Sequence, residues 1–212
     1  MTFENLEFFI FAFTSIFVIV DPISGAVTFV SMTNEMTNQA KNVIARKAVT
    51  LACVIALFFA ITGSLMLNLF NVSIDSLRVA GGLLLFSIAF NMMQAKISRE
   101  SITEEEISQS QERNDIWIFP IALPLLTGPG TISTVIVLIG GAESIEHKII
   151  IVAAIILTFI LCLYIFFFSR KINQLIGYNG MLVFTRVMGL LLAALAVGLI
   201  ATGIINIFRL TT

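Results

Sequence analysis

Hydrophobic residues run along this chain in six long blocks that are separated by short polar connections. The blocks lie at about 8–32, 48–70, 77–95, 116–139, 149–168 and 181–208. A bilayer core about 30 Å thick needs about 20 apolar residues of α-helix to cross it. Each block is close to that length or longer, so the pattern predicts an all-α transmembrane protein with six membrane-spanning helices.

Composition supports the same class. The 212 residues are 58% hydrophobic and 12% charged, and the mean hydropathy is +1.02, far from the values of soluble domains. A net charge of −1 without a basic stripe argues against nucleic-acid binding. Glu4 and Glu7 stand where a cleavable signal would carry positive charge, so we expect the first block to remain as a helix.

Basic residues indicate the orientation, because short cytoplasmic loops are enriched in Lys and Arg. Six crossings place nine basic residues on one side and three on the other. The nine are Lys41, Arg46, Lys47, Lys96, Arg99, Arg113, Arg170, Lys171 and Arg186, and the three are Arg78, Lys148 and Arg209. We therefore expect a multi-pass protein of the prokaryotic cell (inner) membrane with both termini extracytoplasmic.

Two matches within the chain indicate a duplication. The segment Arg78–Leu84 resembles Arg186–Leu192 at an offset of 108 residues, and Asp21-Pro22 resembles Gly128-Pro129 at an offset of 107. Each half would hold three crossings, and an odd number forces the second half to enter from the opposite face. The sequence thus predicts a 3+3 inverted repeat, an arrangement typical of secondary transporters. Its parts would be residues 1–95, a cytoplasmic linker at 96–115, and residues 116–212.

All four prolines of the chain lie in the first and fourth blocks, at Pro22, Pro120, Pro124 and Pro129. Proline pushes the preceding residue out of helical geometry and fits the first position of a new helix. We therefore expect the first helix to break at Val20, with Asp21 capping a new half-helix. The fourth helix should break at Thr127 or Gly128.

A helix that restarts inside the bilayer leaves its first N–H groups without partners, and lipid offers none. Two such N-termini facing each other would attract an anionic group such as a carboxylate. The predicted substrate-binding residues lie at these breaks. They are Asp21, Pro22, Ser24 and Gly25 in the first, and Thr127, Gly128, Pro129, Gly130 and Thr131 in the second. Further hydroxyls nearby belong to Thr28, Ser133 and Thr134.

Asp21 is the one acidic or basic residue deep within a hydrophobic block, about 20 Å along its helix from residue 8. An ionisable side chain at that depth is costly and by default functional. Asp21 could bind a substrate ammonium group, a coupling cation or a proton. The alternative is that it only caps the half-helix, and the two roles are compatible.

Other features predict structure rather than chemistry. Gly81, Gly82 and Gly189 suit close helix packing, and Arg78 and Arg186 should extend to the membrane interfaces. Neither cysteine is assigned a disulfide or a metal. Catalytic sets such as HExxH and nucleotide-binding motifs are missing from the sequence, so we expect no enzymatic activity and no cofactor beyond a possible coupling H⁺ or Na⁺.

Four motifs together resemble the MarC family, also called the small neutral amino acid transporter family. They are "VDPISG" at 20–25, "AGGLLLFSIAFNMM" at 80–93, "PIALPLLTGPGTISTVIVL" at 120–138 and "TRVMGLLLAALAVGLIATGI" at 185–204. The resemblance covers nearly the whole chain. It departs from the family pattern at Ser24, Val27 and Gly198, which bears on substrate preference.

This resemblance implies a six-helix secondary transporter of small neutral amino acids such as alanine, glycine, serine or threonine, acting as an exporter or exchanger. A channel-like pore and a carrier or efflux protein for other small solutes remain as alternatives. The expected partners are the amino acid substrate and the lipid bilayer. The sequence leaves the oligomeric state and the coupling ion open.

Overall fold

The computed structural model describes residues 3–94 and 115–209, and every regular element within them is a helix. The elements are α1 (Phe3–Val20), α2 (Pro22–Met32), α3 (Asn38–Leu69), α4 (Ile74–Met93), η2 (Trp117–Leu126), α6 (Pro129–Gly140) and α7 (Ile145–Arg209). The predicted linker at 96–115 lies outside the described residues except for Asp115. The prediction of an all-helical chain is confirmed for the described part.

Five helical stretches are long and apolar enough to cross a membrane. They are Phe3–Met32, Asn38–Leu69, Ile74–Met93, Ile145–Ile172 and Gly180–Arg209. The pair η2 and α6, bent by 54°, forms a sixth if it counts as one span. Gly177, with φ 64° and ψ 175°, divides α7 into its two spans, because a backbone at positive φ favours glycine.

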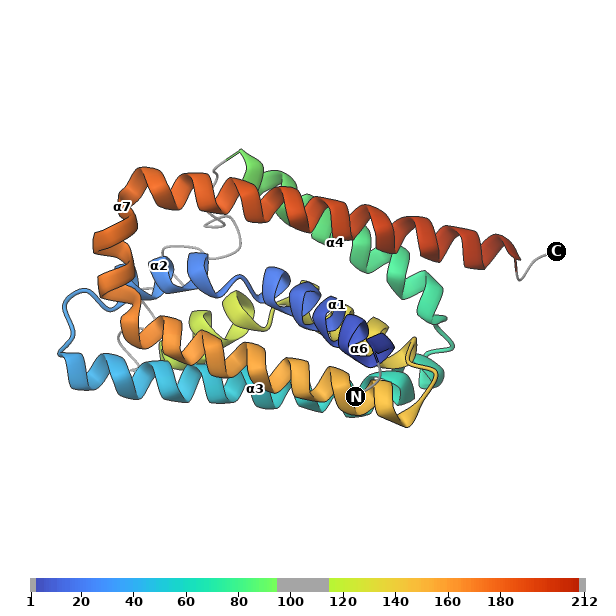
Figure 1. Cartoon of the computed structure of the whole chain (residues 1–212). Helices are drawn as coiled ribbons and strands as arrows, with labels where there is room; N and C mark the ends of the chain where they lie inside the picture. Colours follow the sequence, from blue (N-terminus) through green and yellow to red (C-terminus); the bar gives the residue numbers. More distant parts are fainter. Residues whose placement is uncertain (1–2, 95–114, 210–212) are drawn as a thin grey trace.

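The helices lie in three layers (Figure 1). One outer layer holds α3 and the first half of α7, and the other holds α4 and the second half of α7. The two broken helices, α1–α2 and η2–α6, lie between them, and α6 contacts both α3 and α4. The breaks are therefore placed in the interior of the bundle.

Small residues let the layers approach closely. On α3 a stripe of alanines is buried at Ala45, Ala48, Ala52, Ala56 and Ala60. One turn beyond the stripe, a Cβ added at Gly63 would lie 2.5 Å from Ile136 of α6. Close helix approach through small side chains is the usual packing mode in membranes, and here it holds the second broken helix against α3.

The predicted close packing at Gly82 and Gly189 is confirmed. A Cβ at Gly82 would lie 2.9 Å from the carbonyl oxygen of Ala196, and one at Gly189 would lie 3.0 Å from that of Ala89. The Cβ at Gly189 would also lie 2.8 Å from the Cβ of Met92, so a side chain at either position would force the helices to shift. The two glycines therefore allow α4 and the last span to pack backbone against backbone.

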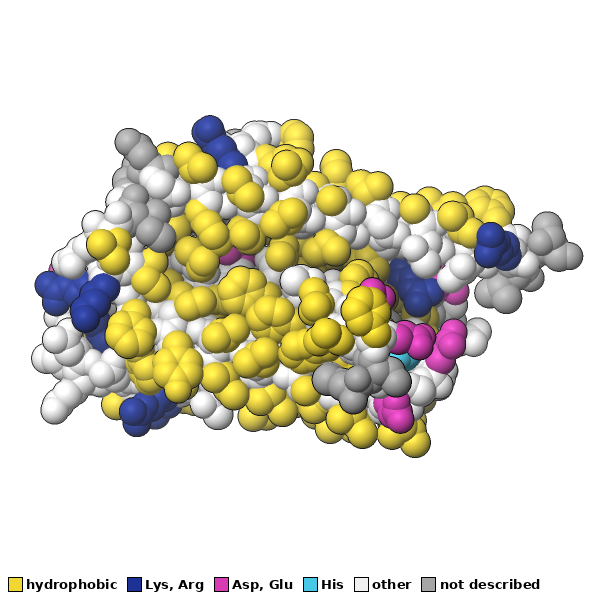
Figure 2. All heavy atoms as spheres, in the orientation of Figure 1, with side chains coloured by type: hydrophobic (Ala, Val, Ile, Leu, Met, Phe, Trp, Pro, Cys, Tyr) yellow, Lys and Arg dark blue, Asp and Glu magenta, His cyan; other side chains and the backbone are white. Residues whose placement is uncertain are grey.

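Charge is unevenly distributed along the molecule, with most basic side chains at one end and most acidic ones at the other (Figure 2). The end that we call the basic end carries Lys41, Arg46, Lys47, Arg170 and Lys171, and the acidic end carries Glu4, Glu7, Asp75, Glu143 and Glu146. Both chain termini lie at the acidic end (Figure 1), as an even number of crossings requires.

The segment before the second break is irregular and not a plain half-helix. Phe119 (φ −121°, ψ 127°) and Leu123 (φ −127°, ψ 127°) are extended inside η2. Each precedes a proline, whose ring disfavours helical geometry at the residue before it. The two additional prolines thus distort the approach to the break over the length of η2.

Candidate functional site

The first break consists of a single residue, Asp21. Its backbone N–H donates to Phe17 at 3.0 Å and so ends α1, while its carbonyl oxygen accepts from Gly25 at 3.0 Å and so begins α2. The side chain accepts from the Ser24 N–H at 3.4 Å. These are the end, cap and restart that the sequence predicts.

Asp21 has an unusual backbone for a cap. Its φ of 44° and ψ of 63° are left-handed, whereas most N-cap residues are extended. Asp and Asn are the non-glycine residues that tolerate this region best. The break therefore depends on an Asp or Asn at position 21 for its backbone as well as for its cap.

The second break lacks a side-chain cap. Gly128 occupies the cap position with φ −75° and ψ 177°, and no side chain accepts from the first turn of α6. Ile132 donates to Gly128 at 3.1 Å. The N–H groups of Gly130 and Thr131 precede this first helical bond, and neither has a partner among the described residues. Two buried amides at the start of α6 are thus open to an acceptor.

The two breaks are neighbours. The Leu126 side chain, just before the second break, lies 3.6 Å from a Cβ placed on Gly25 of α2. Conversely, the Ile19 side chain, just before the first break, lies 3.9 Å from a Cβ placed on Gly130 of α6. Each restarted half-helix therefore contacts the segment that precedes the other break.

Most hydroxyls near the breaks are already used by the fold. Thr127 donates to Ala52 of α3 at 3.1 Å, Thr131 donates to Leu126 at 3.1 Å, and Ser133 donates to Gly130 at 3.0 Å. Thr28 similarly donates to Ser24 at 3.3 Å. Thr127 and Thr131 therefore stabilise the backbone of the second break, and their predicted substrate contacts would come from lone pairs or main-chain groups.

Three hydroxyls are exceptions. Ser15, Thr134 and Thr158 are buried and have no hydrogen-bond partner among the described residues. A hydroxyl inside a membrane helix usually donates to the carbonyl four residues earlier, as Thr62 does to Phe58 at 2.7 Å. Thr134 lies on α6 one turn after the open amides, and it adds a further unused polar group near the second break.

The breaks are not sealed on all sides. Asp21, Ser24 and Gly128 are half-buried, and Pro129 is exposed. Thr127, Gly130 and Thr131 are buried beneath them. The half-buried groups at the two breaks are therefore partly accessible at the surface of the bundle.

Two residues near the site were not predicted from the sequence. Thr185, buried on the last span, shares a hydroxyl contact of 3.3 Å with Ser24. Phe166, buried on the first half of α7, lies 3.5 Å from a Cβ placed on Gly25. The signal for Thr185 was its place at the start of the last motif, "TRVMG". Phe166 carries no local signal, because only the packing brings it to Gly25.

The predicted interface position of Arg78 needs a refinement. Arg78 pairs with Asp75 at 2.6 Å, and both side chains are less than one-fifth exposed. Its charge is thus committed to a partner on its own helix and not to Asp21. Arg186 is exposed. Among the described residues, no group of His, Cys, Asp and Glu side chains is arranged to hold a metal ion.

Known proteins are similar to this chain over nearly its whole length. A family model described as "MarC family integral membrane protein" matches residues 6–208. The chain is 37% identical to the UPF0056 membrane protein YvbG of Bacillus subtilis over 97% of this chain and 98% of that protein. It is 36% identical to the UPF0056 membrane protein YhcE of Escherichia coli over 98% and 96% of the two chains.

A third relative is a UPF0056 membrane protein of Aquifex aeolicus, 34% identical over 95% of this chain and 94% of that protein. No solved structure is significantly similar to this chain. Together with the multi-pass helical bundle, these matches confirm the resemblance seen in the motifs. The chain belongs to the MarC family of integral membrane proteins.

Proposed function

We propose that this chain is a secondary transporter of small neutral amino acids, and that it binds its substrate between the two helix breaks. The observation that carries the proposal is the juxtaposition of opposite polar groups at membrane depth. Asp21 offers a carboxylate, while the first turn of α6 offers the open amides of Gly130 and Thr131. An amino acid is a zwitterion with a group for each.

The chemistry of recognition follows from those two groups. Main-chain N–H groups at a helix N-terminus stabilise a carboxylate by hydrogen bonds and by the helix dipole. The Asp21 carboxylate is a suitable acceptor for the substrate ammonium group, or for a coupling H⁺ or Na⁺. Leu126, Ile19 and Phe166 lie close around the breaks, so a short, uncharged side chain fits this environment best.

Contacts across the bundle support the inverted repeat as part of this proposal. At an offset of 107 residues Gly82 corresponds to Gly189, Ala89 to Ala196, and Met93 to Ile200. Gly82 packs on the Ala196 oxygen and the Ile200 nitrogen, and Gly189 packs on the Ala89 oxygen and the Met93 nitrogen. Such exchange of partners is what a twofold relation between the halves produces.

The breaks follow the same register. At an offset of 107 residues Pro22 corresponds to Pro129 and Ile19 corresponds to Leu126. Ile19, which precedes the first break, lies near Gly130 after the second break, and Leu126, which precedes the second break, lies near Gly25 after the first. The offset of 108 between Arg78–Leu84 and Arg186–Leu192 is one residue away from this register. The contacts therefore favour pairing Gly82, and not Gly81, with Gly189.

Counterflow in liposomes tests the proposal. Purified protein is reconstituted into liposomes that contain an excess of one unlabelled amino acid. Labelled alanine, glycine, serine or threonine is added outside, and its uptake into the liposomes is measured. We expect the labelled amino acid to accumulate transiently and with saturable kinetics. Unlabelled small neutral amino acids added outside should inhibit this uptake by competition. A carrier for other solutes would show no such competition, and a channel would show flux that does not saturate. Either result would exclude the proposed function.

A further inference from the structure

A contact between layers closes the acidic end of the bundle above α6. Ile74 and Arg78 of α4 rest on Gly140 and Gly141, where α6 ends. A Cβ on Gly140 would lie 2.8 Å from the Ile74 side chain, and one on Gly141 would lie 2.7 Å from Nη2 of Arg78. The absence of side chains at these two glycines therefore leaves the space that the Ile74 and Arg78 side chains occupy.

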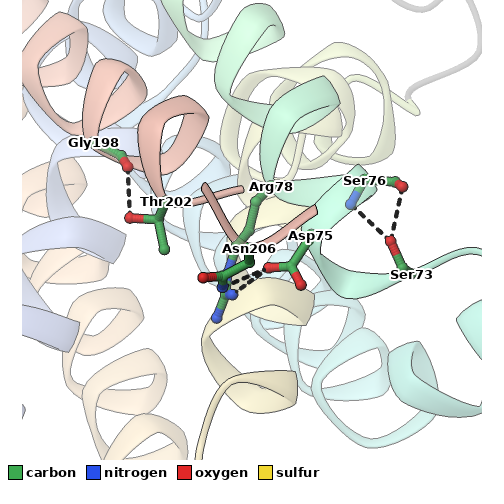
Figure 3. A network of polar contacts seen from close by, with 7 residues as sticks. All are labelled: Ser73, Asp75, Ser76, Arg78, Gly198, Thr202 and Asn206. Carbon is green, nitrogen blue, oxygen red and sulfur yellow. Dashed lines mark hydrogen bonds and ion pairs between the residues drawn. The ribbon is translucent and has the colours of Figure 1, made fainter. Parts of the chain in front are cut away.

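Arg78 is held in this place from a second direction. Its Nη1 pairs with Oδ1 of Asp75 at 2.6 Å, and Asn206 of the last span donates from Nδ2 to the same Asp75 oxygen at 3.0 Å. Figure 3 shows the three side chains converging between α4 and α7. One guanidinium nitrogen thus faces Asp75 while the other faces the end of α6.

The position of Arg78 has an electrostatic consequence. Gly141 is the C-cap of α6, and a helix C-terminus presents carbonyl oxygens and partial negative charge that attract a cation. The same half-helix begins at Pro129, at the candidate site. Its 12 residues span about 18 Å, so α6 directly connects the substrate-binding break with the contact at Arg78.

The opposite side of the breaks has a different polar contact. There the last span meets α2 through the neutral contact of 3.3 Å between the Ser24 and Thr185 hydroxyls. At the acidic end the guanidinium of Arg78 faces the C-terminus of α6 instead, and a cation at a helix C-terminus is stabilised by the helix dipole. The Arg78–Asp75 pair lies within α4, so it orients this guanidinium and does not itself cross the layer contact.

We propose that Arg78 is the latch of a gate at the acidic end, oriented by Asp75 and Asn206 and closed on the C-terminus of α6. This inference rests on the proposed transport function. Substrate passage at this end requires the layer of α4 and the last span to separate from α6, which breaks the contact at Gly140 and Gly141. Asp75 and Asn206 act as positioning residues, since they contact Arg78 or its partner and not the site.

Solvent access to the site tests the latch without any transported substrate. Ser24 is replaced by Cys in a chain whose two native cysteines are replaced by Ala, and a membrane-impermeant maleimide is applied to intact cells and to inverted vesicles. A protein with two conformations typically populates the minor one to about 0.1–10%. Arg78→Gln should therefore raise labelling from one side of the membrane by roughly tenfold. Asp75→Asn and Asn206→Ala should raise it in the same direction and by less.

Ser76→Ala provides the matched control. Ser76 lies on the same turn of α4, and within the described part of the chain its hydroxyl is hydrogen-bonded to Ser73 alone, at 2.8 Å and at the start of that helix (Figure 3). We expect its labelling rate to equal that of the parent chain. Unchanged labelling in Arg78→Gln would overturn the proposed latch. An equal rise in labelling from both sides of the membrane would also overturn it, because such a rise indicates a loosened fold.

A disulfide gives an independent test. Ile74→Cys with Gly140→Cys places one cysteine on each side of the layer contact, where the Ile74 side chain lies 2.8 Å from a Cβ added at Gly140. Oxidation should abolish counterflow and reduction should restore it. Counterflow that persists after complete crosslinking would refute the gate. Failure of the wild-type protein to exchange any amino acid would instead refute the proposed function, while the labelling result would still decide the latch.

Discussion

At the scale of single residues, Asp21 combines three properties that substitution can separate. It caps α2, it adopts a left-handed backbone, and it brings an ionisable carboxyl group into a candidate membrane span. Asn caps about as well as Asp and also tolerates the left-handed region, but it is neutral. Comparing Asn with Ala at this position therefore distinguishes the structural role from the chemical one.

We predict that Asp21→Asn retains folded yield but loses exchange, and that Asp21→Ala loses both. The Ala variant gives up the cap, which costs about 0.5–2 kcal/mol, and places Ala at φ 44°. The measurements are monodisperse yield in detergent and counterflow in liposomes. Glu143→Gln, an equivalent change at an exposed carboxylate, is the control. Wild-type exchange by Asp21→Asn, with the same dependence on pH and sodium, would limit Asp21 to capping.

Glycines at the two breaks differ in the space around them, and this leads to a second prediction. A Cβ at Gly128 would lie 2.6 Å from the backbone oxygen of Pro124, whereas one at Gly25 has no neighbour closer than 3.5 Å. Gly128→Ala should lower the melting temperature in detergent, because the backbone of η2 must move. Gly25→Ala should leave it near the wild-type value. Equal stability of the two variants would mean that the η2 backbone yields easily.

At the scale of helices, the contact between α4 and the last span depends on glycines that face a backbone. Gly82→Leu would insert a side chain where a Cβ already lies 2.6 Å from Ile200. Overpacking of this kind commonly costs about 1–3 kcal/mol. We predict a lower melting temperature and loss of exchange for this variant.

The matched control for that prediction is Gly198→Leu. Gly198 lies on the last span, which packs against α4, but nothing lies within 4 Å of a Cβ added there. It is exposed, so a leucine there should contact lipid and leave both stability and exchange near wild type. Destabilisation by both substitutions would indicate a general effect of replacing a span glycine by leucine and would argue against a specific helix contact.

At the scale of the whole molecule, the separation of charge between the two ends bears on orientation. The basic end should face the cytoplasm, and both termini lie at the acidic end (Figure 1). We therefore predict that a reporter fused after Thr212 reads as extracytoplasmic and that a label at Ser108 reads as cytoplasmic. Periplasmic phosphatase activity and protection from impermeant reagents measure the two positions. A cytoplasmic reporter at the C-terminus would reverse the orientation.

The sequence by itself determined the helical spans and the positions of both breaks. Hydrophobic blocks of membrane length identify spans because burial in lipid depends on the residues of each block alone. Proline likewise acts on its immediate neighbours. This is why the end at Val20, the cap at Asp21 and the restarts at Pro22 and Pro129 could be predicted before any packing was known.

Only the tertiary structure decided how polar groups are shared between distant segments. Thr127 donates to Ala52, Ser24 meets Thr185, and Asn206 binds Asp75. The partners in each pair are 75 or more residues apart, and a donor in an apolar span takes whichever acceptor the packing brings within reach, since lipid supplies none. For the same reason Arg78 appeared in the sequence as an interface residue, and its contact with the end of α6 emerged only from the assembled layers.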